Sequence, residues 1–104
     1  MKTKLIDQIS RDLDLDRGVL ISQGIRAFLK DKKMALLLDR LEILSRNKVT
    51  SEEELQQKIE AGAGEDHPAW EDLIVIENLD VELKKIDEYL ENLRGSEKAG
   101  QGTI

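Results

Sequence analysis

The sequence predicts an all-α protein in which a short helix-turn-helix head is followed by an antiparallel helical hairpin, with copies associating as a helix bundle. Charged residues make up 37% of the 104 positions and aromatic residues 3%, which favours long amphipathic helices over a β-sandwich. Apolar residues near the C-terminal end recur at alternating steps of three and four, the spacing of a helix that lies along another helix. Because a chain of this length buries only part of its apolar surface, association would enlarge its core.

Residues 1–30 are expected to form a small dimerisation head of two helices. The first helix carries apolar residues on one face, at Leu5, Ile6, Ile9 and Leu13. Asp16 stands in the following turn and is the expected N-cap of the second helix. That second helix is expected to provide dimer or core contacts through Leu20, Ile21, Gly24, Ile25 and Phe28. Since glycine inside a helix costs about 1 kcal/mol relative to alanine, we expect Gly24 to lie at an interface where a neighbouring backbone packs close.

Residues 31–93 are expected to form the helical hairpin. Neither glycine nor proline occurs from Arg26 to Lys48, which predicts a long helix over about 31–47. Thr50 is followed three positions later by Glu53, the pattern of a capping box at the start of a short helix. Glycines at positions 62 and 64 then predict a loop before the last helix.

The last helix is predicted over residues 68–93. Pro68 suits the first helical position, and Asp66 or His67 would cap the helix in front of it. The seam that would lie along other helices, as dimer or core contacts, consists of Ile76, Leu79, Leu83, Ile86, Leu90 and Leu93. Residues 94–104 are rich in glycine and polar side chains, and we expect a disordered tail there.

No motif in the sequence predicts catalysis, a metal site or a cofactor. The chain contains no cysteine, which excludes disulfides and zinc–thiolate sites, and it lacks paired histidines on a helix and a glycine-rich phosphate loop after a strand. His67 has Asp66 and Glu71 nearby, but specific metal sites usually need three or four ligands at a recognisable spacing. We therefore interpret His67 as a capping residue and expect a protein without enzymatic activity.

The expected location is the cytoplasm. No apolar run approaches the ~20 residues that cross a bilayer. The N-terminus reaches the acidic Asp7 too soon for a signal peptide. We accordingly expect no membrane partner.

Charge is distributed unequally along the chain. Residues 1–48 hold 11 Lys and Arg against 7 Asp and Glu, whereas residues 49–104 hold 5 against 15. A mildly basic head suits nucleic acid, and a strongly acidic remainder suits a basic protein. The alternative is that solvated helix faces simply differ in sign.

The segment from Leu5 to Leu29, LIDQISRDLDLDRGVLISQGIRAFL, resembles the two helices of ribbon-helix-helix repressors and antitoxins. In that family the two helices form an interlocked dimer, and a strand before the first helix reads the major groove of DNA. Only Met1 to Lys4 precede the first helix here, fewer residues than that strand needs. Either the natural start lies upstream, or the head serves dimerisation alone. The stretch from His67 to Ile74 is also similar to small prokaryotic proteins with antitoxin-like heads.

The resemblance implies a homodimeric antitoxin whose acidic helical region binds a basic toxin nuclease and whose head sits on operator DNA. The residues expected to approach DNA are Lys2, Lys4, Arg11 and Arg17. The residues expected to contact the toxin are Trp70, Glu71, Leu73, Ile74 and Glu77, although Trp70 is also expected to pack against the short helix and the loop. The alternative is a helical oligomerisation or adaptor module with no role in nucleic-acid binding.

Overall fold

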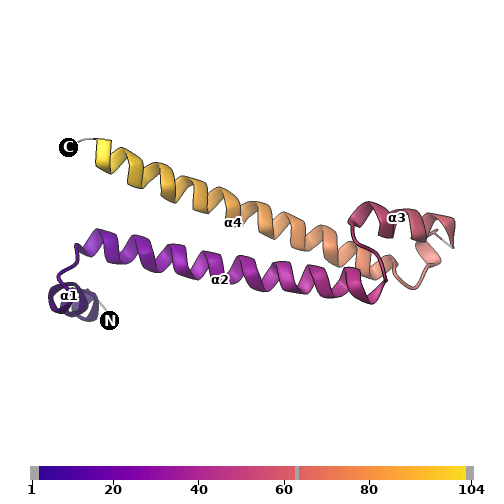
Figure 1. Ribbon diagram of the computed structural model, residues 1–104, viewed down its shortest axis with the longest axis horizontal. Helices are drawn as coiled ribbons and strands as arrows, with labels where there is room; N and C mark the ends of the chain where they lie inside the picture. The colour runs from indigo at the N-terminus through magenta and orange to yellow at the C-terminus, as the bar shows by residue number, and fades with distance from the viewer. Residues whose placement is uncertain (1–2, 63, 103–104) are drawn as a thin grey trace. The chain divides into compact units, whose positions relative to one another are not determined.

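Helices make up the fold, and the predicted all-α class is confirmed. The computed structural model describes residues 3–62 and 64–102, and no strand occurs among them. The helices are α1 (Thr3–Asp12), α2 (Arg17–Arg46), α3 (Glu52–Ala61), the short 3-10 helix η1 (Gly64–Asp66) and α4 (Trp70–Gly102) (Figure 1). The chain divides into two compact units, which we call the first unit (residues 1–31 and 89–104) and the second unit (residues 32–88).

The turn between α1 and α2 uses the chemistry that its sequence predicts. Asp14 takes a left-handed conformation with φ 54°, and the Leu15 N–H donates to the carbonyl of Ser10 at 2.8 Å, which ends α1. The N–H of Val19 then donates to the Asp16 carboxylate at 3.2 Å. Asp16 is therefore the N-cap of α2, as predicted.

α2 is one continuous helix from Arg17 to Arg46, so the helix expected over 31–47 is the second part of a longer one. Exposed polar residues separate its two apolar stretches, and no glycine or proline interrupts the helix at that point. α2 ends where Lys48 takes φ 59° and the Val49 N–H donates to the Leu44 carbonyl at 3.0 Å. Both α1 and α2 thus end in a left-handed residue that is not glycine.

The core of the second unit lies where α2, α3 and α4 meet. Leu55, Ile59 and Ile76 are fully buried there. They form one cluster with Ile43, Leu44, Ala69 and Leu73. Because α3 supplies two of the three fully buried side chains, this short helix closes the core.

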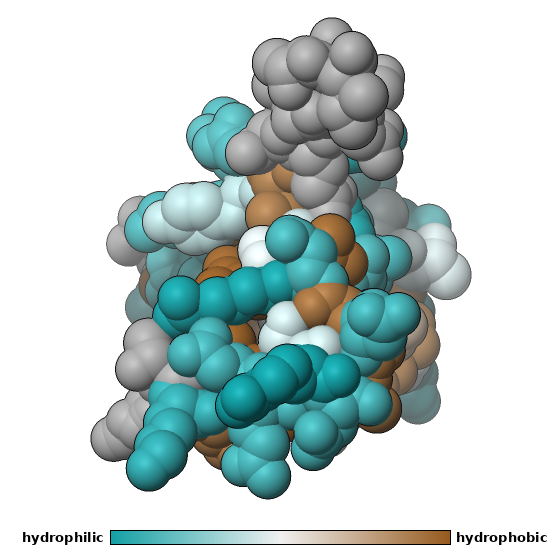
Figure 2. All heavy atoms as spheres, turned by 90° about the vertical axis from the view of Figure 1, so that its left-hand side faces the viewer, coloured by the Kyte–Doolittle hydropathy of each residue, from teal (hydrophilic) through white to brown (hydrophobic). Residues whose placement is uncertain are grey.

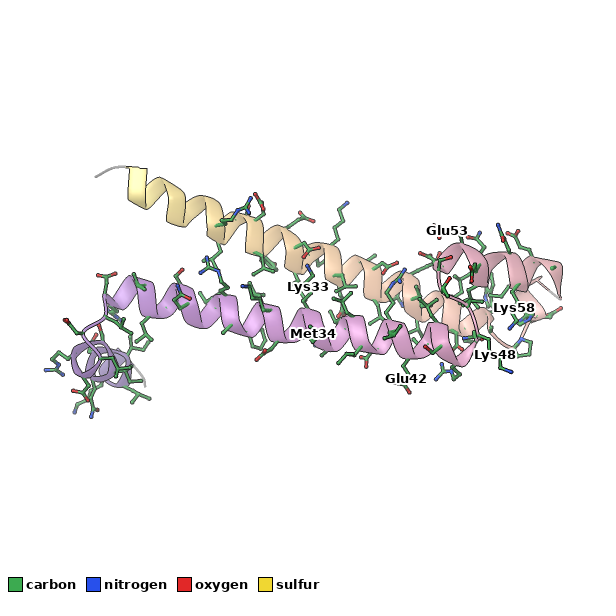
Figure 3. The ribbon with its side chains drawn as sticks, viewed as in Figure 1. Lys33, Met34, Glu42, Lys48, Glu53 and Lys58 are labelled. Carbon is green, nitrogen blue, oxygen red and sulfur yellow. The ribbon has the colours of Figure 1, made fainter. Side chains whose placement is uncertain are left out.

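Within the second unit, ion pairs between described residues join α2 to α4 in antiparallel register. Lys33 pairs with Asp87 at 2.7 Å, Arg40 with Asp80 at 2.7 Å and Arg46 with Asp72 at 2.7 Å. As the residue number increases along α2, the number of the paired residue on α4 decreases, so the two helices run in opposite directions. Figure 3 shows Lys33 between the two helices and Glu42 pointing away from α4.

The start of α3 differs from the prediction by one residue. Ser51, and not Thr50, is the N-cap: its hydroxyl accepts from the Glu54 N–H at 3.1 Å. The Glu54 carboxylate in turn accepts from the Thr50 N–H at 2.9 Å and from its hydroxyl at 3.0 Å. These bonds lower the pKa of Glu54 and leave Glu53 outside the cap.

α4 begins at Trp70, so the prediction that Pro68 occupies its first position is wrong. The preceding residues form a turn in which the Trp70 N–H donates to the His67 carbonyl at 3.0 Å. The ring Nδ1 of His67 accepts from the Ala69 N–H at 3.0 Å. His67 therefore caps this turn rather than the helix.

The tail boundary at residue 94 is also corrected, because α4 continues as a helix to Gly102. Arg94 pairs with Glu91 one turn earlier at 3.2 Å, which favours helix at that point. A single glycine such as Gly95 weakens a helix by about 1 kcal/mol but does not break it. Residues 103–104 of the expected tail lie outside the described residues.

Candidate protein-interaction site

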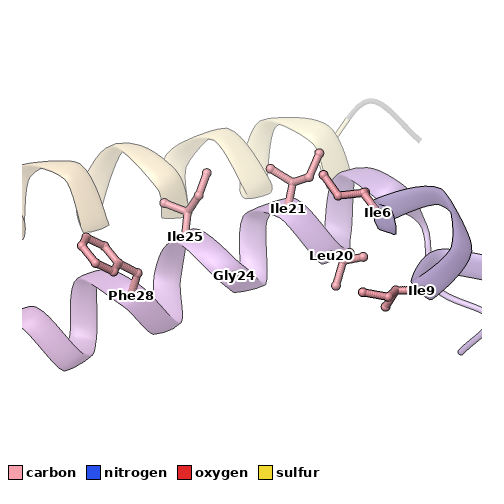
Figure 4. A pocket seen from close by; sticks show the side chains of 7 residues that line it. All are labelled: Ile6, Ile9, Leu20, Ile21, Gly24, Ile25 and Phe28. Carbon is pink, nitrogen blue, oxygen red and sulfur yellow. The ribbon is translucent and has the colours of Figure 1, made fainter. Parts of the chain in front are cut away.

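An open apolar groove lies in the first unit, on the side of α2 that α1 approaches (Figure 4). Its lining is almost wholly apolar and consists of Ile6, Ile9, Leu20, Ile21, Gly24, Ile25 and Phe28. Five of these residues are the expected dimer or core residues of the second helix. α1 adds Ile6 and Ile9. Their spacing of three on an apolar face was the signal that could have placed them in the site.

The described side chains leave much of the groove's lining exposed. Ile21 is 40% exposed, Ile25 46% and Phe28 67%, and none of residues 4–31 is buried. Figure 2, a view of one face, shows apolar side chains reaching the surface between hydrophilic ones. Apart from α2's own backbone and the two residues next to Gly24, no atom of the described residues lies within 4 Å of a Cβ built on Gly24, so the expectation of a close neighbouring backbone is wrong within one chain.

The residues expected to approach DNA lie on exposed parts of α1 and at the start of α2. Lys4, Arg11 and Arg17 are exposed, and Arg17 pairs with Asp7 at 3.4 Å. Lys2 lies outside the described residues. Because α1 already begins at Thr3, no ribbon strand is found in the described part of the chain.

The residues expected to contact a protein partner are divided between surface and core. Ile74 is 40% exposed, and Glu71 and Glu77 are also exposed. Trp70 is half-buried and packs against the core cluster. Leu73 is corrected: it is only 4% exposed and belongs to the core, so it cannot present a side chain to a partner.

A guanidinium that the sequence did not single out connects the three helices of the second unit. Arg40 on α2 donates to both carboxylate oxygens of Asp80 on α4, at 2.7 and 3.3 Å. Glu52 on α3 lies 3.8 Å from the same guanidinium. The hydrogen bond to Asp80 raises the pKa of Arg40, whereas burial and the neighbouring Asp80 raise the pKa of Glu52. Asp80 is therefore a strong ion-pair partner of Arg40, whereas Glu52 is a poor one.

The two units carry different charge. Residues 3–31 and 89–102 of the first unit together hold seven Lys and Arg and seven Asp and Glu, whereas residues 32–88 hold eight against fifteen. Internal ion pairs use some of the acidic groups, but Glu71, Glu77, Glu82 and Glu88 are exposed along α4. The acidic surface expected from the sequence therefore belongs to the second unit.

Among the described residues, no three side chains of the types that usually hold metal ions come together. In the same part of the chain, no helix combines the length and apolar character that crossing a membrane requires.

A comparison with curated proteins gave no match, and a comparison with solved structures gave none. A family model, however, matches residues 1–98, nearly the whole chain. The chain therefore belongs to the uncharacterized protein MJ0235 family.

Proposed function

We propose that this chain is a non-enzymatic antitoxin-type protein whose acidic second unit binds a basic protein partner, a toxin nuclease. The observation that carries the proposal is the separation of charge, because residues 32–88 hold fifteen acidic against eight basic side chains while residues 3–31 are balanced. A surface of one sign attracts a partner of the opposite sign and speeds its association.

The outer side of α4 is the best candidate for the contact. Ile74, Glu77, Val81 and Glu88 follow one another at steps of four, three, four and seven from Trp70, which places them on one side of the helix. Ile74 is 40% exposed and Val81 56%, and the glutamates beside them are exposed. Apolar contacts surrounded by acidic groups suit a basic surface that is partly apolar. Trp70, at the start of this series, packs against the core cluster.

The antitoxin role combines this surface with the resemblance of the first two helices to antitoxin heads. An enzyme that cleaves RNA needs a basic cleft to bind phosphates. An acidic helix that occupies the cleft would exclude the RNA. The proposal is confined to the protein partner, because the described residues contain no strand of the kind with which ribbon-helix-helix proteins read DNA.

The test is co-expression with a basic nuclease encoded next to this chain, with growth and co-purification as the two measurements. Reversing two charges on α4, Glu77→Lys with Glu88→Lys, should weaken the complex about tenfold and reduce growth rescue. The matched control is Asp39→Lys with Glu42→Lys, which makes the same change in net charge at exposed positions of α2. No complex with a neighbouring nuclease would refute the function. Equal weakening by the two double variants would refute the assignment to α4.

A helical self-association module is the second candidate, and the apolar groove of the first unit favours it. Such a module would not rescue growth from a toxin. Its melting temperature would rise with protein concentration whether or not a partner is present.

A further inference from the structure

An exposed strip of apolar side chains, which we call the α2 strip, lies on one side of α2 in the second unit. It consists of Met34, Leu37, Leu38 and Leu41. Each of these residues lies three positions from one other member and four positions from another, so they are neighbours on the helix surface. Their exposed fractions run from 41% for Leu37 to 59% for Leu41. A contiguous apolar surface of this kind is typical of an interaction site.

The α2 strip continues the side of α2 that α3 covers. Leu44 is only 4% exposed and forms one buried cluster with Leu55 and Ile59 of α3. Leu37 lies seven positions before Leu44, about two helical turns, and therefore on the same side of α2. Figure 3 shows Met34 further along α2, on the part that α3 does not reach. The short helix thus covers one end of this side and leaves the strip exposed.

α3 also shows what this side of the helix pair accepts. It is an amphipathic helix of 10 residues in which Leu55 and Ile59, four positions apart, are fully buried. Most of its other side chains are exposed. A second helix with apolar side chains at the same spacing would cover the α2 strip in the same way and extend the three-helix packing.

Negative charge gathers beside the strip, at the start of α3. The hydrogen bond to Asp80 raises the pKa of Arg40. The charges of Glu52 and Glu53 raise it further, so both carboxylates lie close to this guanidinium. One arginine cannot neutralise three carboxylates. Because Arg40 lies three positions after Leu37, this surplus of negative charge borders the apolar surface.

We propose that the α2 strip binds an amphipathic helix of another protein, whose lysine or arginine side chains lie beside Glu52 and Glu53. The strip supplies apolar surface to bury, and the surplus carboxylates attract a basic helix. A second copy of this chain fits less well, because its second unit holds fifteen acidic against eight basic side chains and would be repelled. The inference is independent of the proposed function, which places its contact on α4.

Fluorescence anisotropy with two synthetic helical peptides tests the proposal on the full chain. Both peptides carry leucine at steps of three and four along one side, and the flanking positions hold lysine in one peptide and glutamate in the other. The lysine peptide should bind at least about tenfold more tightly, and added salt should reduce this difference. No binding of the lysine peptide would overturn the proposal, as would equal binding of the two peptides.

Serine substitutions locate the bound peptide. Leu37→Ser should weaken binding of the lysine peptide at least about tenfold, whereas Val75→Ser should leave it unchanged. Val75 is the matched control, because it is an apolar residue of the same unit that is 43% exposed, against 41% for Leu37. Leu41→Ser repeats the test at a position that is 59% exposed and therefore contributes little to the core. Far-UV circular dichroism checks that each variant remains helical. Equal weakening by the variants at 37 and 75 would overturn the assignment to the strip.

Glu53→Gln tests the contribution of charge. It should weaken binding of the lysine peptide about threefold, whereas Glu82→Gln, at an exposed position of α4, should not. Equal effects of the two variants would contradict the placement of the basic side chains. Light scattering examines the other occupant. A dimer that Leu41→Ser dissociates and that excludes the peptide would place a second copy on the strip and overturn the proposal.

Discussion

Replacing Asp80 with asparagine removes the charge that holds Arg40 while keeping the shape of the side chain. Asp80 accepts two hydrogen bonds from Arg40, which joins α2 to α4 in the second unit. Both side chains are partly shielded from solvent, at 26% and 37% exposed, so the pair is neither fully screened nor fully desolvated. The bidentate geometry makes this one of the stronger polar contacts between the helices.

The expected cost of Asp80→Asn is about 1 kcal/mol of unfolding free energy. Exposed ion pairs contribute about 0.2–1 kcal/mol and hydrogen bonds to charged groups about 1.5–3 kcal/mol, and this pair lies between the two situations. For a domain of this size, 1 kcal/mol corresponds to a fall in Tm of roughly 4–8 °C.

Glu52 provides the contrast, although its carboxylate lies only 3.8 Å from the Arg40 guanidinium. Burial and the nearby Asp80 raise the pKa of Glu52, so these surroundings disfavour its charged form in the fold. For a carboxyl with a raised folded pKa, stability is greatest below the ordinary value and falls as pH rises through the folded pKa. Glu52→Gln should therefore change the unfolding free energy at neutral pH by less than about 0.5 kcal/mol.

Urea and thermal unfolding followed by far-UV circular dichroism, at one fixed protein concentration, measure both variants. The double variant adds a check: once Asp80 is neutral, Glu52 is the remaining carboxylate beside Arg40, so Glu52→Gln should cost more in that background. Equal losses of unfolding free energy from the two single variants would refute the reasoning. The distance to Arg40 alone, and not desolvation, would then determine how much each carboxylate contributes to stability.

Two further predictions concern the loop before α4 and the acid limit of the second unit. Gly62→Ala should lower the unfolding free energy by about 1–2 kcal/mol, because the added Cβ would lie 2.8 Å from the His67 ring. Gly95→Ala is the control and should not lower it, because the space around that position is open. Equal urea midpoints for the two variants would contradict this prediction. The hydrogen bond from Asn47 lowers the pKa of Asp72 below its ordinary value of 3.8, so its contribution is present above that pH and is lost as pH falls through the folded pKa. The difference in stability between the wild type and Asp72→Asn should therefore shrink from about pH 5 to pH 2, and a constant difference would contradict the assignment.

Local sequence signals predicted the start of α2 but not that of α3. Asp16 was the predicted cap in its turn, and its carboxylate accepts from the Val19 N–H. At α3 the sequence offers two equivalent patterns, since Thr50 and Ser51 are each followed three positions later by a glutamate. The structure selects Ser51, because Thr50 bonds to the Glu54 side chain through both its N–H and its hydroxyl. Where two local patterns are equivalent, only such contacts in the folded chain decide which residue caps the helix.

Contacts between helices were harder to predict, because periodicity defines the apolar face of each helix but not the register between two helices. Arg40 and Asp80 are forty positions apart, and nothing in their spacing indicates that they meet. The groove is an intermediate case. Its α2 lining follows from helical spacing, whereas the contribution of Ile6 and Ile9 depends on the turn that brings α1 beside α2.

Leu73 shows why a regular seam can mislead at the end of a helix. If the seam is extended from Ile76 towards the N-terminus with the same alternating steps of four and three, its next positions are Asp72 and Ala69. Leu73 is not one of these positions, and we expected it to contact a partner. In the structure, Leu73 shares one buried cluster with Leu55 and Ile59 of α3. A third helix therefore covers a second side of α4 near its start, and the buried face widens from the narrow seam of a helix pair to the broader face of a bundle. Because α3 has only 10 residues, this widening is confined to the first turns, and Val81 two turns further on is 56% exposed.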